Sequence, residues 1–512
     1  MQNTKLYPAD RLRWLAAIAI VLAMAVPLLA TPFPLLIDLP AHVARYHVER
    51  NLPFTPELSR FFTYSWRYLP NLGVDLSVAF LSQWTNVETA ARLVAATIPP
   101  IGAAGMLWLG YRLHGRITAT ALLSLPLNYA YPLIFGFVNS CLAVSLSFVV
   151  CAGWLTLEQR GQTRWSALLL AIAAPVIITA HMIGYGVMGL MIAGVAAGQA
   201  MRQGHRPTEL LKTVFLKALP ISWPLILLVF WRNDQTGTAG RWFDFALDAR
   251  WLLMILRERH NIFDIASAGM LYGAALLPLL ARRRFSSDPR ALVPAILLWA
   301  CVFLMPSQIV GSEFAAVRLI APALALGLLA VSEVKPLPRW IWGSAFTFVL
   351  LRLVVSTVTF VDVSQRADRE LALLDQVRSG SRMVAIWLTD CRRDWEPPRY
   401  SHLGAFATVR RNALVNGHFM SSGQQLMSLV PNADDALTEA PSMISAEPCE
   451  RLGQKDSAAD IVRRLPWRHI DYLWLIDIGD LAIPLPVTAH QIAATGQSRL
   501  LRVDPGVFAK PQ

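Results

Sequence analysis

Charged side chains are scarce in this sequence. Only 16% of its 512 residues are Asp, Glu, Lys or Arg, whereas soluble domains average roughly 25%. Hydrophobic residues make up 55%, and several long runs contain no charge: Trp14 to Ile37, Leu93 to Tyr111, Ile117 to Leu157 and Trp165 to Met201. Since a helix crosses a hydrocarbon core in about 20 residues, the first two runs predict one span each and the last two predict a pair each. The sequence therefore predicts a polytopic membrane protein and excludes a mainly soluble one.

Cysteine is also rare, and its spacing excludes common metal sites. The five cysteines form no CxxC pair, which argues against structural zinc and iron–sulfur centres. Internal repeats and low-complexity tracts are absent as well. The net charge of +12 does not indicate nucleic-acid binding, because many of the basic residues lie in short loops between apolar segments, as expected of cytoplasmic loops.

Placing the basic loops in the cytoplasm gives a map of about eleven transmembrane helices. The apolar stretch near residues 14–31 resembles a signal peptide, but its length and Leu28 favour retention as the first helix. The amino terminus is then cytoplasmic and everything beyond residue 362 is periplasmic. The predicted fold is mainly α: a transmembrane bundle over 1–362, with a first periplasmic loop over 32–87, and a small α/β domain over 363–512.

Shorter segments add detail to this map. The apolar stretch from Gly73 to Gln83 is too short to span and predicts a helix lying along the interface. Segments 383–388 and 472–476 predict strands of the last domain. Because the periplasm oxidises thiols, Cys391 and Cys449, the two cysteines of that domain, are predicted to form a disulfide; two separate thiols remain the alternative.

Asp38 is the first candidate for chemistry, since it follows the first apolar helix directly. His42 comes four residues later, and a helix from Pro40 would bring both side chains into one pocket. The carboxylate could act as a general base or bind a metal ion. Alternatively, Asp38 caps a short interfacial helix, because Asp two residues before Pro is a common helix start.

Further polar residues fall near the predicted outer ends of helices: Asn139, His181 and Arg318. Each alone could be a solvated group at a turn. Arg318 stands just inside an apolar segment, where a guanidinium needs a partner or a polar cavity, and its planar fork suits a phosphate. Arg352 also interrupts an apolar segment, and its side chain is expected to extend toward the outer interface.

Several short segments together resemble the GT-C superfamily of membrane glycosyltransferases. They are an acidic residue after the first helix, a Pro-Asn-Leu segment where relatives carry His-Pro-Pro-Leu, and an Arg near the start of the second helix; the residues are Asp38, Pro70 to Leu76, and Ala91 to Leu93. Arg318 to Pro322 is similar to a late Arg-Tyr-Leu-Leu-Pro element of the same proteins. The segments Asp38 to His42 and Gly136 to Asn139, with His181, also resemble uncharacterised bacterial relatives of that superfamily.

The resemblance implies inverting transfer of a sugar from a polyprenyl-phosphate carrier to a lipid, glycan or protein acceptor outside a bacterial inner membrane. Asp38 would be the catalytic base and Arg318 would hold the carrier phosphate. His42, Asp75, Arg92, Asn139 and His181 would contact substrate, while Asp75 and Glu57 are rival carboxylates. Leu39 replaces the second acidic residue of some relatives, so use of a divalent metal ion stays open and no other cofactor is expected.

Two other functions remain open. A transporter or flippase for a lipid-linked precursor would predict an inverted repeat and broken helices, which the sequence does not show. A noncatalytic scaffold for envelope polysaccharide assembly would tolerate replacement of Asp38 and Arg318.

Overall fold

The computed structural model describes residues 8–231, 240–309, 312–335, 337–392, 395–420, 425–431 and 435–504. The described chain forms two compact units. Unit 1 comprises residues 1–30, 68–77 and 92–359, and unit 2 comprises 31–67, 78–91 and 360–512. Unit 2 thus combines most of the first predicted loop with the carboxyl-terminal region.

Unit 1 consists mostly of long apolar helices. Six helices of the described chain are long and apolar enough to cross a membrane: α6 (Val87–His114), α9 (Val138–Gln159), α10 (Thr163–Ala180), α11 (Met182–Arg202), α12 with the 3-10 helix η3 (Pro207–Phe230), and α18 (Arg339–Leu371) with η4, up to Gln376. Shorter apolar stretches are those of α1 (Pro8–Ala23) with α2 (Val26–Leu29), Ala119–Phe135, α16 (Pro289–Leu304) and α17 (Val317–Ala330). Helix is therefore confirmed as the dominant structure, whereas the number of crossings stays a prediction.

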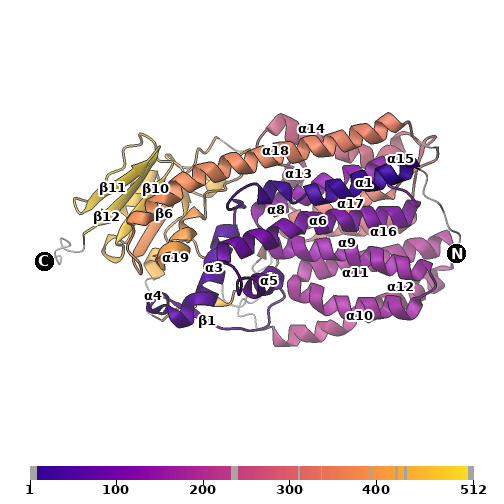
Figure 1. Cartoon of the computed structure of the whole chain (residues 1–512), viewed down its shortest axis with the longest axis horizontal. Helices are drawn as coiled ribbons and strands as arrows, with labels where there is room; N and C mark the ends of the chain where they lie inside the picture. The colour runs from indigo at the N-terminus through magenta and orange to yellow at the C-terminus, as the bar shows by residue number, and fades with distance from the viewer. Residues whose placement is uncertain are drawn as a thin grey trace. The chain divides into compact units, whose positions relative to one another are not determined.

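Long helices of unit 1, among them α6, α9 and α11, run side by side (Figure 1). They approach closely where small residues face a neighbour. A Cβ on Gly184 of α11 would lie 2.2 Å from the Cβ of Ala143 in α9, and one on Gly194 would lie 2.7 Å from Pro294 of α16. Close packing of backbones through small residues is typical of helices in lipid. Large apolar side chains such as Leu22 and Val229 are exposed, as expected of surfaces that face acyl chains.

One predicted span is broken. Residues 119–135 form three short pieces: α7 (Ala119–Leu123), η2 (Leu125–Tyr129) and α8 (Tyr131–Phe135). Pro126 and Pro132 stand in the first turn of the second and third pieces, where a proline lacks the N–H that a continuous helix needs. A broken helix, which the sequence analysis did not detect, is therefore present at this place.

The remaining helices of unit 1 are α13 (Phe245–Leu253), α14 (Asn261–Ala275) and α15 (Leu277–Leu280). Short strand pairs join its loops: β2 (Phe285–Ser287) with β5 (Val331–Glu333), and β3 (Gln308–Ile309) with β4 (Ser312–Glu313). The last long helix, α18, continues to Leu371, past residue 362, where the transmembrane bundle was predicted to end. Its apolar run ends there, but the polar residues that follow are good helix formers.

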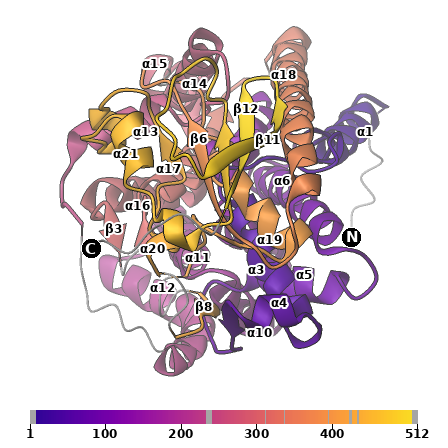
Figure 2. The ribbon, with the colours of Figure 1, turned by 90° about the vertical axis from the view of Figure 1, so that its left-hand side faces the viewer.

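Unit 2 is built on a mixed sheet with the strand order β11-β12-β10-β6-β7, and β9 also pairs with β6 (Figure 2). The strands are β6 (Arg382–Leu388), β7 (Leu414–Val415), β9 (Met443–Ile444), β10 (Tyr472–Ile476), β11 (Ala489–Thr495) and β12 (Ser498–Val503). Strand β6 is parallel to β7, β9 and β10, whereas β12 is antiparallel to β10 and β11. Both predicted strands are confirmed as β6 and β10, and they pair at the centre of the sheet.

The first loop supplies part of the core of unit 2. Val48, Leu58 and Phe62 are buried in one cluster with Val384 and Leu473 of the central strands. The loop contains α3 (Leu39–Asn51), α4 (Pro56–Ser59) and β1 (Phe62–Tyr64), which pairs with β8 (Met427–Leu429). Helix α3 packs against α19 (Phe406–Arg411) and the 3-10 helix η5 (Leu403–Ala405).

Other elements complete unit 2. They are α20 (Asp435–Thr438), α21 (Ala458–Arg463) and the end of α5 (Gly73–Leu81), which begins in unit 1. Cys391 and Cys449 are joined by a disulfide with a Cα–Cα distance of 5.9 Å.

Candidate functional site

Asp38 stands at the N-cap position of α3, but it does not act as a side-chain cap. Its φ of −89° and ψ of −14° are helical, and its carboxylate accepts no hydrogen bond from the first turn. By contrast, Asp288 is the N-cap of α16 and does accept from the backbone N–H of Arg290, at 3.0 Å. Asp38 therefore does not have the capping role that the sequence offered as an alternative. Its side chain is 13% exposed.

His402 is one of the ionisable groups beside Asp38. Its Nε2 is 3.8 Å from Oδ1 of Asp38, within unit 2. Its Nδ1 is 3.0 Å from the carbonyl oxygen of Gly417. A carbonyl oxygen only accepts, so Nδ1 carries the proton of the neutral ring and Nε2 presents a lone pair. Burial lowers the pKa of His402 to about 4, so the ring is neutral near pH 7.

Packing of small side chains sets the distance between His402 and Asp38. Ala41 and Ala44 of α3 form a buried cluster with Ala405 of η5, and Phe419 packs against them. The same Phe419 ring lies 4.9 Å from the ring of His402. Small residues on both sides let α3 and η5 approach closely, which places His402 beside the start of α3.

His42 occupies the first turn of α3 in the same region. Its ring stacks with Tyr46 at 6.4 Å and lies 5.5 Å from Phe419. Within the described chain its Nδ1 is buried and has no hydrogen-bond partner. Burial, followed by the charges of Arg45 and His402, lowers its pKa well below the usual value. The sequence prediction that His42 shares the surroundings of Asp38 is consistent with this placement, whereas a substrate contact stays a prediction.

Sequence reasoning missed His402, His418 and Arg45. His418 Nε2 lies 2.9 Å from Thr408 Oγ1, and Arg45 is buried and donates to Gln425 Oε1. No local motif marks His402, which stands 364 positions after Asp38. Only the folded chain brings the two together.

Asp75 and Asn139 meet in unit 1, where they bind each other. Asn139 Nδ2 donates to Asp75 Oδ2 at 2.9 Å and to the carbonyl oxygen of Asn71 at 3.0 Å, while its Oδ1 accepts from Val74 N. Both side chains are buried. These bonds hold the start of α5 against α9, so both residues have a structural role, and contact of either with substrate stays a prediction.

The segment before α5 lies against the α10–α11 turn. Leu72 N donates to the carbonyl oxygen of Thr179 at 2.8 Å, and Met182 N donates to that of Pro70 at 3.0 Å. A Cβ on Gly73 would lie 2.8 Å from that of Ala180, so this approach requires glycine. The Pro-Asn-Leu segment is thus fixed beside His181, which forms the turn. Arg92 lies further along, in α6, and is half-buried.

His181 and Arg318, which the sequence placed near outer helix ends, come together in unit 1. Nδ1 of His181 accepts from Ile183 N at 3.0 Å and so caps α11. A neutral ring that accepts at Nδ1 carries its proton on Nε2, and Nε2 lies 3.4 Å from a guanidinium nitrogen of Arg318. Two N–H groups therefore face each other and can donate to one acceptor between or beside them.

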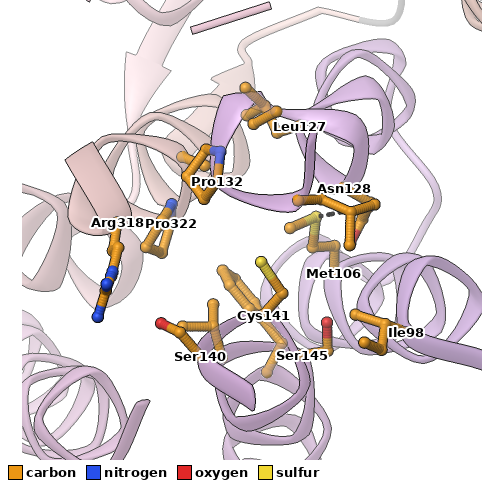
Figure 3. Close-up of a pocket in the computed structure, with 15 residues that line it drawn as sticks. Ile98, Met106, Leu127, Asn128, Pro132, Ser140, Cys141, Ser145, Arg318 and Pro322 are labelled. Carbon is orange, nitrogen blue, oxygen red and sulfur yellow. Dashed lines mark hydrogen bonds between the residues drawn. The ribbon is translucent and has the colours of Figure 1, made fainter. Parts of the chain in front are cut away.

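The guanidinium of Arg318 also lies over the ring of Phe137, 4.0 Å from its centroid. A pocket runs from Arg318 and Pro322 toward Asn128 and Met106, and Figure 3 shows these side chains at its two ends. Its volume of about 40 Å³ has room for about three water molecules and not for a sugar. The donors at its rim therefore suit a small anionic group.

Arg352 does not extend toward the interface, so that expectation was wrong. It is 3% exposed and donates to Asp264 Oδ1 at 2.6 Å, with Glu258 Oε2 at 3.6 Å. Asp264 also accepts from the backbone N–H groups of Glu258 and Arg259. Glu258 lies in the α13–α14 loop and Asp264 in the first turn of α14, and these two carboxylates make extension to water unnecessary. In the same loop, Arg257 donates to the hydroxyl of Tyr131 at 2.8 Å.

Across the described ranges, no group of three or more His, Cys, Asp and Glu side chains is arranged to hold a metal ion.

No protein-family model matches the chain, and no curated protein matches it significantly. Solved structures do match. ArnT from Cupriavidus metallidurans in the apo state aligns with a TM-score of 0.51 at 11% identity, over 99% of this chain and 100% of that one. The same protein bound to undecaprenyl phosphate aligns with a TM-score of 0.48 at 11% identity, over 98% and 99%. The apo-state likeness shows that this chain has the fold of ArnT.

Proposed function

We propose that this protein is an inverting glycosyltransferase that moves a sugar from a polyprenyl-phosphate carrier to an acceptor at the periplasmic face of a bacterial inner membrane. The observation that supports it most is the ArnT fold over nearly the whole chain. Because one fold can host several functions, the proposal also depends on the side chains of the candidate site.

Asp38 is the proposed base. An acceptor hydroxyl is a poor nucleophile, and a carboxylate within about 3 Å can take its proton as the sugar–phosphate bond breaks. Asp38 suits this role because its carboxylate is not used to cap α3 and is partly exposed. The phosphate departs as an anion, so no general acid is needed, in contrast to glycosidases, which need two carboxylates.

Arg318 and His181 are the proposed phosphate-binding pair. Their N–H groups lie 3.4 Å apart, so both can donate to one phosphate oxygen, which is a strong acceptor. The crystallised ArnT carries undecaprenyl phosphate, an anionic lipid of the same class as the proposed carrier. The proposed donor is therefore a polyprenyl-phosphate-linked sugar, and the acceptor is a lipid, glycan or protein.

The test uses the purified full chain in lipid nanodiscs with radiolabelled polyprenyl-phosphate sugars and an extract of envelope acceptors. We expect release of polyprenyl phosphate and a labelled product whose anomeric configuration, read by NMR, is inverted. A retained configuration would disprove the inverting mechanism. Movement of a fluorescent carrier between leaflets of a vesicle without chemical change would instead assign a transporter, which the broken stretch 119–135 keeps open as an outcome. If neither activity is found, the noncatalytic scaffold function is the one that remains.

A further inference from the structure

An open apolar groove lies beside the turn that joins α9 to α10 in unit 1. Five hydrophobic side chains and one amide line it: Leu157 of α9, Gln162 of the turn, and Trp165, Leu168, Leu169 and Ile172 of α10. Its volume is about 420 Å³, within the range of roughly 300 to 1,000 Å³ that is typical of ligand pockets. The groove therefore has room for a substantial apolar group.

The groove lies on the outward face of α10. Trp165 is 63% exposed, Leu168 46% and Ile172 60%, and their spacing of three and four residues places them on one side of the helix. Both α9 and α10 are long and apolar enough to cross a membrane. A hydrophobic helix face of this kind meets lipid in the bilayer. An acyl chain is therefore the apolar group that can fill the groove.

Positive charge lies at the end of the groove where the chain turns. The turn carries Arg160 and Arg164, both exposed, on either side of Gln162, which lines the groove. The nearest acidic residue in the sequence is Glu158, and its carboxylate is already paired with Lys217 of α12. The two arginines thus bring an excess of positive charge to one end of an apolar groove.

Trp165 marks the boundary between the two parts of the groove. It follows Arg164 directly, and its ring is part of the apolar lining. Tryptophan is enriched at membrane–water interfaces, because its ring packs against acyl chains while its indole N–H donates to polar groups. The headgroup region of the membrane is therefore expected at this turn, beside the arginines.

We propose that this groove binds an anionic phospholipid, with an acyl chain along α10 and the headgroup phosphate at Arg160 and Arg164. Guanidinium groups bind phosphate through charge-assisted hydrogen bonds that are frequently bidentate. Basic pockets between helices on the cytoplasmic side are typical binding sites for anionic headgroups, and the sequence predicts that this turn is cytoplasmic.

The proposed lipid site is separate from the proposed phosphate-binding pair. The guanidinium of Arg318 lies over Phe137, which precedes the first residue of α9, whereas the groove lies at the last turn of the same helix. Since α9 has 22 residues and a helix rises 1.5 Å per residue, roughly 30 Å separate its two ends. Lipid binding at the groove therefore does not depend on glycosyl transfer.

Native mass spectrometry of the full chain in detergent tests this proposal through lipid affinity alone. The two probes are phosphatidylglycerol and phosphatidylcholine with identical acyl chains. We expect the wild type to bind one phosphatidylglycerol roughly 30-fold more tightly than phosphatidylcholine, because each of two basic residues near a headgroup contributes about fivefold. Equal affinities for the two lipids would overturn the proposal.

Charge variants test the headgroup end. Arg160→Gln combined with Arg164→Gln should remove most of the preference for phosphatidylglycerol. The matched control is Arg282→Gln with Arg283→Gln, because these are two exposed arginines of another turn, between α15 and β2. This control should keep the wild-type preference. A preference that survives without Arg160 and Arg164, or that falls equally in the control, would overturn the proposal.

A groove-filling variant tests the acyl-chain end. Leu168→Trp adds bulk to the lining without changing the charge, so the bound phosphatidylglycerol should be lost. Val176→Trp is the control, since Val176 is 56% exposed on the same α10 but does not line the groove. Equal retention of the lipid by both variants would overturn the groove as the binding site. A wild-type dimer that Leu168→Trp dissociates would assign the groove to a second copy of the chain and would also overturn the proposal.

Discussion

Two buried polar regions of this protein are built on opposite principles. Around Arg352 in unit 1, donors meet acceptors. The guanidinium donates to Asp264, and backbone N–H groups donate to the same carboxylate. Around Asp38 in unit 2, an acceptor meets an acceptor, because Nε2 of His402 presents a lone pair toward the carboxylate. The first contact joins opposite charges, whereas the second joins a carboxylate to a neutral imidazole ring.

A third arrangement belongs with the second. At the α10–α11 turn, the N–H of His181 faces the guanidinium of Arg318, so a donor meets a donor. Both groups can donate to one anion. The Arg352 contact pairs opposite charges and serves the fold, whereas the His181–Arg318 contact offers two donors that an anion can bind.

The largest effect on stability is expected at Arg352, whose guanidinium is paired with buried carboxylates. Arg352→Met removes the donor and leaves Asp264 and Glu258 buried without their cation, which costs about 3 to 5 kcal/mol. Thermal unfolding in detergent, followed by a thiol-reactive dye or by circular dichroism, should show this loss. An unchanged melting temperature would mean that Arg352 is not a structural residue.

The disulfide should matter slightly less and only in unit 2. Cys391 and Cys449 close a loop of 58 residues, which stabilises the folded state by about 4 kcal/mol if chain entropy alone acts. The double change Cys391→Ser with Cys449→Ser should lower the stability of the sheet domain while leaving the Arg352 region intact. Mass spectrometry that finds both thiols alkylated in the unreduced, denatured wild type would reject the bond.

Acid should weaken the region of Asp38. The folded pKa of His402 is about 4 and that of His418 about 3, both below the unfolded value near 6.5 because of burial. The unfolded chain therefore binds more protons, and the free energy of unfolding falls as the pH drops from about 6.5 toward 4, by on the order of 3 kcal/mol for His402. His402→Asn should reduce this slope. A stability that rises over that pH range on acidification would contradict the burial of neutral histidines.

The donor–donor contact predicts a smaller, specific effect on ligand binding. Arg318→Ala should weaken binding of a polyprenyl phosphate roughly 10-fold to 100-fold, since charge-assisted hydrogen bonds contribute about 1.5 to 3 kcal/mol. Arg318→Lys keeps the charge but loses the planar fork, so its affinity should lie in between. Equal carrier affinity in wild type and Arg318→Ala, measured by tryptophan quenching or native mass spectrometry, would limit the residue to contacts within the protein.

Sequence patterns predicted the helices and central strands because those follow from local apolar runs. The break at 119–135 was also present in the sequence, at Pro126 and Pro132, but was not recognised. The pairing of Arg352 with Asp264, 88 positions earlier, could not be predicted from spacing. Likewise, the tautomer of His402 depends on which ring nitrogen bonds to the carbonyl oxygen of Gly417, and only the folded backbone decides that.

The central claim is that Asp38 is the base of sugar transfer, and its most direct test compares Asp38→Asn with Asp288→Asn. Both residues are N-caps, but Asp288 pairs with Arg290 and Arg202, so its loss should cost stability and little turnover at a temperature where the protein stays folded. Single-turnover transfer from a radiolabelled polyprenyl-phosphate sugar should fall about 10²-fold to 10⁴-fold in Asp38→Asn, with unchanged stability and carrier binding. A folded Asp38→Asn protein that transfers sugar at the wild-type rate would contradict the claim.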